Sequence, residues 1–303
     1  MESQLGKTLL IVNPAAKTGK GAAAGCKAKE ILSSQLGDNF QYCETSAANE
    51  AVELAKRANG FDLVIALGGD GVIHEVVNGL MAIPLESRPA CGIIPVGSGN
   101  DFARTLGVSE DIETACEVIF QNKRRLQDIG VCNEHYFMET VSFGIDAAIA
   151  LETVERRKRT NKTGTALYVE AGINQLVNHR DARNYSAWFD NGEEICASSL
   201  TFAVQIGKTY GGGFYICPDA DPSDGLFDIC IAHPPFGVAA AIRLFLKAKD
   251  GKHVNNPKIE MFQASKCQIV FEETVPAQMD GEDCTNSEFN ISIIHNALQF
   301  VFA

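Results

Sequence analysis

The sequence predicts an α/β domain with a parallel sheet, followed by a second domain built mainly of strands. Short apolar runs alternate with helical patterns over roughly the first 120 residues, which is typical of parallel strands joined by helical crossovers. Glycine-rich turns follow three of these runs, at the strand ends where open α/β sheets bind ligands. From about Arg124, short strand-like runs separated by turn residues predominate, which favours a β-sandwich-like domain.

The most informative stretch is Asp62–Leu80. Leu63–Leu67 is a short apolar run bounded by polar residues, as expected of a strand buried on both faces. After the glycines, apolar residues recur at helical spacing from Val72 onward, which predicts a helix with one buried face. A strand-to-helix turn presents free N–H groups that suit phosphate. The carboxylate of Asp70 would repel phosphate at this turn unless a cation lies between them or a sugar or base of the ligand donates a hydrogen bond to it. The alternative is that Asp70 only caps the helix.

Other elements of the first domain follow from the same patterns. We expect strands over Leu9–Val12, Gln41–Thr45 and Cys91–Pro95, and a helix over Ala22–Leu36. Thr45 or Ser46 is expected to cap the next helix, because hydroxyl side chains accept hydrogen bonds from the first helical N–H groups.

In the second domain, Asp190–Gly192 predicts a hairpin between the strands Tyr185–Phe189 and Glu193–Cys196. Two helical stretches interrupt the strands. They are Ala147 to about Leu176, broken near Asn161–Gly164, and Val238–Lys249.

Composition excludes several classes of function. The formal net charge of -12 argues against nucleic acid as a partner. The ten cysteines include no C-x-x-C pair, and no signal peptide is evident, so we expect reduced core thiols in a cytoplasmic protein. No apolar run approaches the ~18 residues that a membrane-spanning helix needs.

Two common nucleotide-binding motifs do not fit. A Walker A loop needs a glycine five residues before Gly-Lys-Thr, and Gly6-Lys7-Thr8 and Gly207-Lys208-Thr209 both lack it. Gly19, Gly21 and Gly25 follow the first strand, but their spacing differs from the Rossmann pattern. A dinucleotide-dependent oxidoreductase would also leave the turns at Gly68 and Gly97 unexplained.

The motifs taken together resemble the diacylglycerol kinase catalytic-domain family, which includes sphingosine and ceramide kinases and many bacterial lipid kinases. The matching residues are Asn13-Pro14, Gly19-Lys20-Gly21, Gly68-Gly69-Asp70-Gly71 with Glu75, Pro95–Ala103, Asp128, Gly144-Ile145-Asp146, Gly211-Gly212-Gly213, Pro218–Asp228 and Asp280-Gly281-Glu282. The resemblance implies an ATP-binding α/β domain over 1–125, a β-sandwich-like lipid-substrate domain over 126–296, and an active site in the cleft between them. It also implies that 297–303 return to the first domain.

The resemblance further implies an ATP- and Mg²⁺-dependent transfer of the γ-phosphoryl group to a lipid hydroxyl. Nucleotide-binding positions would be Asn13, Pro14, Thr45, Gly68, Gly69, Asp70, Gly71, Glu75, Gly97, Ser98, Asn100 and Asp101. Asp70 would act at the phosphates through Mg²⁺, and Glu282 or Asp280 would be the general base, with the longer Glu282 preferred. Substrate contacts would come from Asp128, Asp146 and Lys162, and a second magnesium would bind Asp221, Asp224 and Leu226.

Two departures leave alternatives open. Val72 stands where the family usually has threonine, and Ser98 replaces a commoner threonine. Valine removes a hydroxyl near the phosphates, so a non-catalytic lipid- or nucleotide-binding member is one alternative. An NAD kinase-like enzyme, with a similar Gly-Gly-Asp-Gly turn, is another. Taken singly, Asp280-Gly281 also fits an ordinary tight turn, and Asp219–Leu226 an exposed acidic turn.

A lipid substrate implies peripheral contact with the inner membrane surface. The basic run Arg156–Arg159 with Lys162 could attract anionic lipid, but a solvated helix end explains it equally well. A homodimer is possible.

Overall fold

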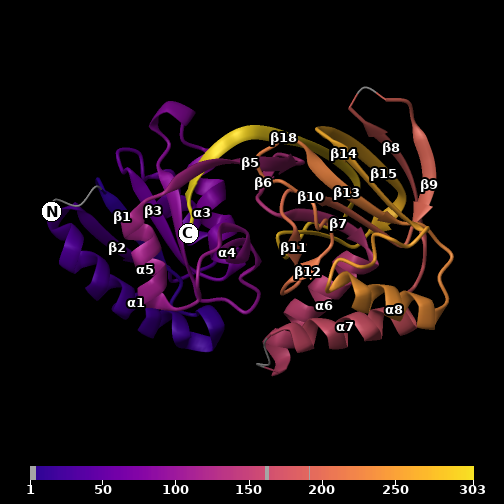
Figure 1. Cartoon of the computed structure of the whole chain (residues 1–303), viewed down its shortest axis with the longest axis horizontal. Coiled ribbons are helices and arrows are strands. Elements are labelled where there is room, and N and C mark those ends of the chain that lie inside the picture. Colours follow the sequence, from indigo (N-terminus) through magenta and orange to yellow (C-terminus); the bar gives the residue numbers. More distant parts are fainter. Residues whose placement is uncertain (1–4, 161–163, 191) are drawn as a thin grey trace. The chain divides into compact units, whose positions relative to one another are not determined.

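A computed structural model describes residues 5–160, 164–190 and 192–303 (Figure 1). The chain forms two compact units. One reaches to Gln127 and also includes Asn296–Ala303, and the other is Asp128–His295. Strands β5 (Arg124–Cys132) and β18 (Asn286–Val301) each contribute residues to both units.

The first unit contains the predicted parallel sheet. Its strands follow the order β2 (Phe40–Glu44), β1 (Thr8–Val12), β3 (Leu63–Gly68), β4 (Ala90–Pro95), and all neighbouring pairs are parallel. Every residue of β1, β3 and β4 is buried, as expected of a sheet covered by helices on both faces. The end of β18 extends the sheet in parallel beside β4, where Phe300 pairs with Cys91.

The described residues of this unit form five α-helices: α1 (Ala16–Leu36), α2 (Glu50–Lys56), α3 (Asp70–Met81), α4 (Asp101–Leu106) and α5 (Ile112–Gln121). The predicted face of α3, with Val72, Val76 and Leu80, is buried, which confirms the periodicity argument. Gly79 lets α2 approach, because a Cβ there would lie 2.4 Å from the carbonyl oxygen of Val52.

Two details of this unit differ from the prediction. α1 begins at Ala16 rather than Ala22, and Lys17, Thr18 and Gly19 interrupt it with left-handed backbone angles. Thr45 does not cap a helix, because its hydroxyl donates to the carbonyl of Val12 at the end of β1. α2 begins five residues later, at Glu50.

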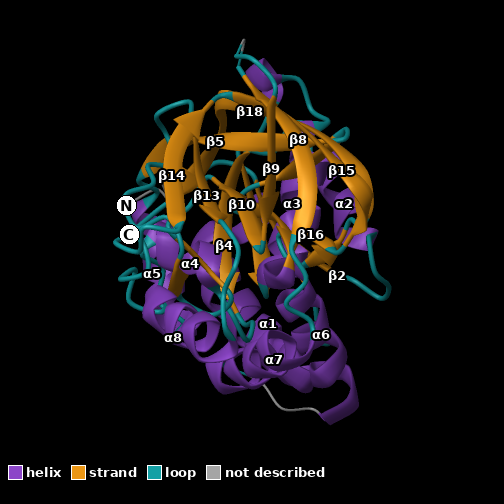
Figure 2. Cartoon of the chain, turned by 90° about the vertical axis from the view of Figure 1, so that its right-hand side faces the viewer, coloured by secondary structure: helices purple, strands orange, loops and turns teal. Residues whose placement is uncertain are grey.

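The second unit is an antiparallel β-sandwich (Figure 2). One sheet has the order β14 (Ile259–Ala264), β13 (Phe227–Ala232), β10 (Thr201–Gln205), β7 (Thr140–Gly144), β16 (Ala277–Met279) and β17 (Glu282–Asp283). The other contains the first part of β18, then β15 (Lys266–Val275), β8 (Arg183–Phe189) and β9 (Ile195–Ser199). β6 (His135–Phe137) pairs with β5, and β11 (Thr209–Tyr210) pairs with β12 (Phe214–Tyr215).

Aromatic side chains fill the space between the two sheets. Phe143 lies 5.7 Å from Phe202 of its own sheet and 4.4 Å from Phe289 of the facing sheet, measured between ring centroids. All three are fully buried. Burial of large rings from both inner faces is what holds a sandwich together.

In the part of the second unit that the structure describes, there are three helices: α6 (Ile145–Thr160), α7 (Thr165–Asn178) and α8 (Val238–Ala248). Separate helices on either side of Gly164 confirm the predicted break, although 161–163 lie outside the described residues. β8 and β9 pair antiparallel, as the hairpin prediction requires. The second strand begins at Ile195 rather than Glu193, and residue 191 lies outside the described part.

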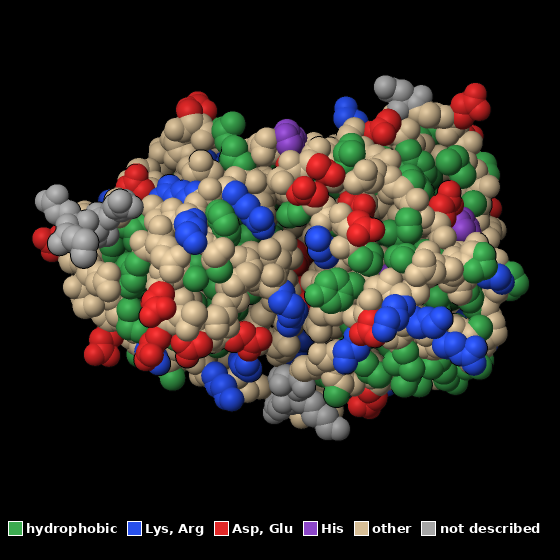
Figure 3. All heavy atoms as spheres, in the orientation of Figure 1, with side chains coloured by type: hydrophobic (Ala, Val, Ile, Leu, Met, Phe, Trp, Pro, Cys, Tyr) green, Lys and Arg blue, Asp and Glu red, His purple; other side chains and the backbone are tan. Residues whose placement is uncertain are grey.

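The surface charge and the burial of the cysteines agree only partly with what the sequence predicts. Acidic side chains are spread over the face drawn in Figure 3. All ten cysteines are free thiols, but Cys26 and Cys196 are exposed, so the prediction of core thiols is wrong for these two. Among the described residues, no helix is both long enough and apolar enough to cross a bilayer.

Candidate active site

Two glycine turns lie side by side at the carboxyl edge of the first sheet. They follow the neighbouring strands β3 and β4, and the N–H of Val96 donates to the carbonyl of Gly68 at 2.7 Å. A Cβ on Gly97 would lie 2.5 Å from the Cα of Gly69, so only glycine allows the backbones to approach this closely. The turns therefore form one continuous main-chain surface that leads into α3 and α4.

Asp70 joins these turns through its carboxylate. Its Oδ2 accepts from the N–H of Asn100 at 2.8 Å, and its Oδ1 from that of Phe102 at 3.4 Å. These N–H groups belong to the N-cap and first turn of α4, so Asp70 caps the neighbouring helix rather than its own. A carboxylate at the positive end of a helix is electrostatically favoured. The helix-cap alternative thus describes what Asp70 does in the fold, and its action on phosphate stays a prediction.

Asn100 closes the second turn. It has left-handed backbone angles, and its side-chain Oδ1 accepts from the N–H of Gly97 at 2.8 Å. Asp101, which follows, pairs with Arg104 at 2.7 Å, and the same guanidinium donates to the carbonyl of Gly99. Arg104 was not a predicted site residue. Its half-exposed cation lies directly beside the glycine turn, where phosphate recognition commonly uses arginine.

The ends of β1 and β2 supply further predicted nucleotide positions at the same edge. The N–H of Asn13 donates to the carbonyl of Leu67, and that of Thr45 to the carbonyl of Val12. A Cβ on Gly68 would lie 3.4 Å from the Cβ of Asn13. The structure therefore brings Asn13, Thr45 and the two glycine turns to one edge of one sheet.

Glu75 and Val72 lie elsewhere on α3. Glu75 Oε2 accepts from the N–H of Ala51, in the first turn of α2, at 3.2 Å. The carboxylates of Asp70 and Glu75 thus cap two different helices from one helix. Val72 is buried, and its Cγ1 fills the space that a side chain at Gly68 would need.

Asp280 and Glu282, both candidates for the general base, lie at one hairpin turn of the second unit, where Asp280 is the first central residue of the turn and Glu282 is the first residue of β17. Asp280 and Gly281 both have positive φ, which is the geometry of a type I′ turn. The Asp280 carboxylate accepts from the N–H groups of Met138, Glu139 and Thr140, at 2.8, 3.0 and 3.0 Å. The carboxylate of Asp280 therefore organises buried backbone, whereas Glu282 is exposed on β17.

Asp128 holds the acidic loop Asp219–Leu226 in place. Its carboxylate has 0% exposure, with Oδ2 accepting from the N–H of Gly225 at 2.7 Å and Oδ1 2.9 Å from Nδ1 of His295. The N–H of Asp128 donates to the carbonyl of Pro222. These contacts give Asp128 a structural role, and its predicted contact with substrate stays a prediction.

The acidic loop satisfies much of its own hydrogen bonding. Asp221 Oδ1 accepts from the N–H and hydroxyl of Ser223, and Asp224 Oδ1 accepts from the N–H of Leu226. Gln263 donates to Asp224 Oδ2. The described residues contain no group of three His, Cys, Asp or Glu side chains arranged to hold a metal. The predicted magnesium ligands Asp221, Asp224 and Leu226 therefore stay a prediction.

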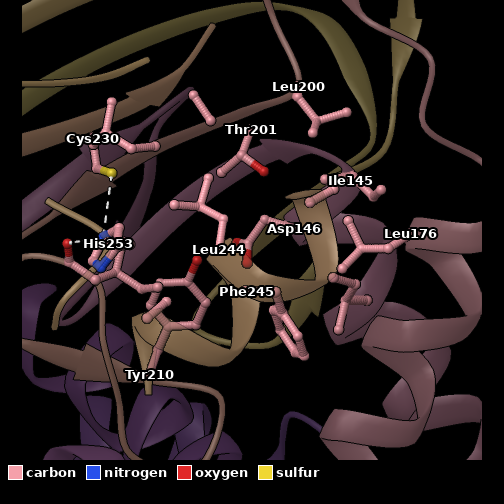
Figure 4. A pocket seen from close by; sticks show the side chains of 16 residues that line it. Ile145, Asp146, Leu176, Leu200, Thr201, Tyr210, Cys230, Leu244, Phe245 and His253 are labelled. Atoms are coloured by element: carbon pink, nitrogen blue, oxygen red, sulfur yellow. Dashed lines mark hydrogen bonds between the residues drawn. The ribbon is translucent and has the colours of Figure 1, made fainter. Parts of the chain in front are cut away.

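A mainly apolar cavity of about 80 Å³ lies in the second unit, among α6, α7, α8 and the strands β10 and β13 (Figure 4). Its apolar lining includes Leu176, Leu244 and Phe245. The carboxyl group of Asp146 also lines it and is buried, with the Tyr168 hydroxyl donating to Oδ1 at 3.3 Å. Burial raises the pKa of Asp146, and the hydrogen bond from the Tyr168 hydroxyl partly offsets this.

Two further polar residues at this cavity, His253 and Cys230, were not predicted as site residues. His253 Nε2 lies 3.0 Å from the carbonyl of Ile216 and 3.8 Å from Sγ of Cys230. Burial lowers the pKa of His253, so the neutral ring donates from Nε2 and leaves Nδ1 as an acceptor. Among the described residues, Nδ1 has no hydrogen-bond partner. The remaining predicted substrate residue, Lys162, lies outside the described residues.

Comparison with known proteins identifies the family. Residues 7–132 match the diacylglycerol kinase catalytic domain, and residues 139–302 match the YegS C-terminal NAD kinase beta sandwich-like domain. The chain is 34% identical to the diacylglycerol kinase of Bacillus subtilis over 251 residues, covering 82% of this chain and 80% of the relative. The chain belongs to the diacylglycerol kinase catalytic-domain family.

Other relatives agree with this assignment. This lipid kinase family member is 31% identical to a Chromohalobacter salexigens protein named "Probable lipid kinase YegS-like", over 87% of this chain and 84% of that protein. Its fold matches a diacylglycerol kinase crystal structure from Bacillus anthracis, with a TM-score of 0.80, 24% identity and coverage of 99% and 98%. An Archaeoglobus fulgidus NAD kinase in complex with ATP matches with a TM-score of 0.53 at 14% identity, covering 97% of this chain and 92% of the other. Both structural likenesses concern the fold alone.

Proposed function

We propose that this kinase family member transfers the γ-phosphoryl group of ATP to the hydroxyl of a diacylglycerol-like lipid. The observation that carries the lipid acceptor is the cavity in the second unit, whose lining is mainly apolar and includes a buried carboxyl group. Apolar walls with a few polar groups are typical of sites for amphiphilic ligands. A cavity of about 80 Å³ holds several waters or part of one acyl chain, so a long chain would need α7 or α8 to shift.

The buried carboxyl group favours an uncharged polar group in this cavity. Burial raises the pKa of Asp146, and its Oδ2 has no hydrogen-bond partner among the described residues, so this carboxyl group can bond to a polar group of the ligand. His253 Nδ1 offers a second acceptor. A glycerol or amide group supplies both donors and acceptors for such a pair.

The nucleotide would bind at the carboxyl edge of the first sheet. The glycine turns after β3 and β4 offer main-chain N–H groups, and Arg104 offers a cation near them. Phosphoryl transfer depends on positioning and charge neutralisation. In the proposed step the lipid hydroxyl oxygen attacks the γ-phosphorus, ADP leaves, and a carboxylate takes the hydroxyl proton. Glu282 is the better base, because the oxygens of Asp280 already accept three N–H groups.

Magnesium fits the nucleotide better than the acidic loop. Mg²⁺ in kinases usually binds substrate phosphates with one or two carboxylates, where it neutralises phosphate charge. Asp70 is the carboxylate that the glycine turns present. In the acidic loop the carboxylates instead bond to Ser223, Leu226 and Gln263. The carboxylates of the loop nevertheless repel one another. Burial is the largest cause that raises the pKa of Asp228, and the charges of Asp224, Asp219 and Asp221 raise it further.

Magnesium binding at the loop can be measured without turnover. The melting temperature is compared with and without excess Mg²⁺, in the absence of nucleotide, for the wild type and Asp224→Ala. Stabilisation of the wild type alone would support a structural ion at the loop. Equal stabilisation of both, or of neither, would remove the loop from the magnesium sites.

The proposed reaction is tested with γ-labelled ATP and a panel that contains diacylglycerol, ceramide, sphingosine and NAD. We expect label in diacylglycerol, and loss of that label when EDTA removes Mg²⁺. Label in NAD alone would identify the NAD kinase-like alternative. Nucleotide binding without label in any acceptor would identify a non-catalytic member.

A further inference from the structure

The outer faces of α7 and α8 expose large apolar side chains. Ile173 and Val177 on α7 are 39% and 46% exposed, and Val238 and Leu246 on α8 are 37% and 47% exposed. Residues four apart share one helical face, so the two α7 side chains lie together. These four are among nine large apolar side chains that are exposed in the described part of the chain.

The two helices form one surface, because they pack directly against each other. A Cβ on Gly172 of α7 would lie 2.4 Å from the ring of Phe245 on α8. The inner side of the same helices lines the cavity through Leu176, Leu244 and Phe245. The α7–α8 face, defined by Ile173, Val177, Val238 and Leu246, therefore covers the proposed acceptor cavity.

Cations gather at the same face. Arg243 and Lys247 on α8, and Lys249 just after it, are exposed, and no ion pair links them to a carboxylate among the described residues. Figure 3 shows basic and apolar side chains intermingled over the region where Figure 1 places α7 and α8. The nearby carboxylates of Glu170 and Asp250 are engaged, by Arg156 and Lys252 respectively.

The basic run predicted from the sequence is different. Arg156 pairs with Glu152 at 2.5 Å and Glu170 at 2.6 Å, and Lys158 pairs with Glu155 at 2.9 Å. These pairs neutralise the charges of Arg156 and Lys158 within the protein. No carboxylate among the described residues pairs with Arg243, Lys247 or Lys249, so these three cations are available to anions.

We propose that the α7–α8 face, with Arg243, Lys247 and Lys249, docks on a lipid bilayer that contains anionic lipid. This proposal rests on the proposed function, since it explains how a lipid acceptor reaches the cavity. Helices with apolar side chains flanked by Lys and Arg lie in the membrane interface. On a chain with a net charge of -12, an anionic bilayer would repel most other surfaces and so orient the protein.

The test is co-sedimentation of the full chain with vesicles of phosphatidylcholine alone, or of phosphatidylcholine with about one-third phosphatidylglycerol. We expect the wild type to partition onto the anionic vesicles and to dissociate at high salt. Substituting Arg243→Gln, Lys247→Gln and Lys249→Gln together should weaken partitioning about 100-fold, at roughly fivefold for each cation. The double substitution Val177→Ser and Leu246→Ser should weaken it at least about tenfold.

Two matched controls come from the same unit. Ile195→Ser removes an apolar side chain of similar exposure on β9, and Lys266→Gln removes an exposed cation on β15. Both should partition as the wild type does. Melting temperatures of all variants should lie within a few degrees of the wild type, because every substituted side chain is exposed.

Several results would overturn the proposal. They are equal binding of the wild type to both kinds of vesicle, wild-type partitioning by the α8 variants, or an equal loss in the controls. A dimer in light scattering that Leu246→Ser disperses, without vesicle binding, would assign the face to a second copy of the chain. Turnover of a water-soluble short-chain diacylglycerol is measured separately, without vesicles. If the wild type has no such activity, the proposed function is refuted and the docking proposal is still decided by the vesicle experiment.

Discussion

Replacing Asp70 by asparagine separates two roles of one carboxylate. In the structure its oxygens accept from the N–H groups of Asn100, at 2.8 Å, and Phe102, at 3.4 Å. A hydrogen bond to a charged group contributes ~1.5–3 kcal/mol, against ~0.5–1.5 kcal/mol for a neutral one. Asparagine keeps a single carbonyl oxygen, which can hold the shorter bond. We therefore expect Asp70→Asn to lower the free energy of unfolding by about 1–2 kcal/mol.

The catalytic role would produce a much larger effect on turnover. If the carboxylate also acts on the nucleotide phosphates, Asp70→Asn should lower kcat at least ~100-fold, which corresponds to about 2.7 kcal/mol of transition-state stabilisation. A stability loss of about 1–2 kcal/mol leaves a typical domain folded at the assay temperature. Unfolding therefore cannot produce such a fall in kcat. Denaturant unfolding and steady-state turnover, measured on the same preparation, give the two quantities.

Asp111→Asn is the matched control. Asp111 caps α5, where its Oδ1 accepts from the N–H and the hydroxyl of Thr114, both at 2.9 Å. We expect unchanged turnover and at most a small loss of stability, because asparagine caps a helix about as well as aspartate. If Asp70→Asn behaves in the same way, Asp70 is only a helix cap and the placement of the phosphates at these turns is wrong.

The remaining predictions concern four other residues. Glu282→Gln should lower kcat ~10²–10⁴-fold with little change in stability. Asp280→Asn should instead lower the free energy of unfolding by about 2–3 kcal/mol, and the opposite pattern would exchange their roles. Val72→Thr should tighten ATP binding by ~0.5–1.5 kcal/mol in calorimetry, and unchanged affinity would show that the hydroxyl does not reach the nucleotide. Burial raises the pKa of Asp146 above 3.8, so the folded state keeps a proton that the unfolded state loses above about pH 4. The free energy of unfolding should therefore fall as pH rises through the folded-state pKa, and Asp146→Asn should flatten that fall. Parallel pH profiles of wild type and variant would contradict the burial argument.

The spacing of apolar residues within each segment was sufficient to predict the main helices and strands of the first unit. The period of four from Val72 to Leu80 predicted the buried face of α3, and the apolar run Leu63–Leu67 predicted β3, because burial on a regular element repeats at a fixed spacing. The glycine turns could also be predicted from the sequence. The contact between them could not be predicted, because Gly69 and Gly97 lie close together only when β3 and β4 are neighbours in the sheet.

The partners of the polar side chains could not be predicted in the same way. The sequence selected Asp280 as a candidate base, yet its carboxylate bonds to residues 138–140 of a distant segment. Glu75 reaches the first turn of α2. Thr45 was expected to cap a helix, but the parallel pairing of β1 and β2 brings its hydroxyl to Val12. Side chains of this kind are satisfied by tertiary neighbours, and spacing along the chain contains little information about them.

The ending of β18 in the first unit constrains the order of events during synthesis. Phe300 is fully buried there and packs edge-on against Phe102, with ring centroids 4.8 Å apart. Arg88 donates to the carbonyl of Ala297, which fixes the same segment. Everything from Asp128 to His295 is translated between Gln127 and these residues, which takes on the order of ten seconds at ~5–20 residues per second. During that interval the nascent first unit lacks the Phe300 ring of its core, so the apolar side chains next to β4 are exposed and could bind a chaperone.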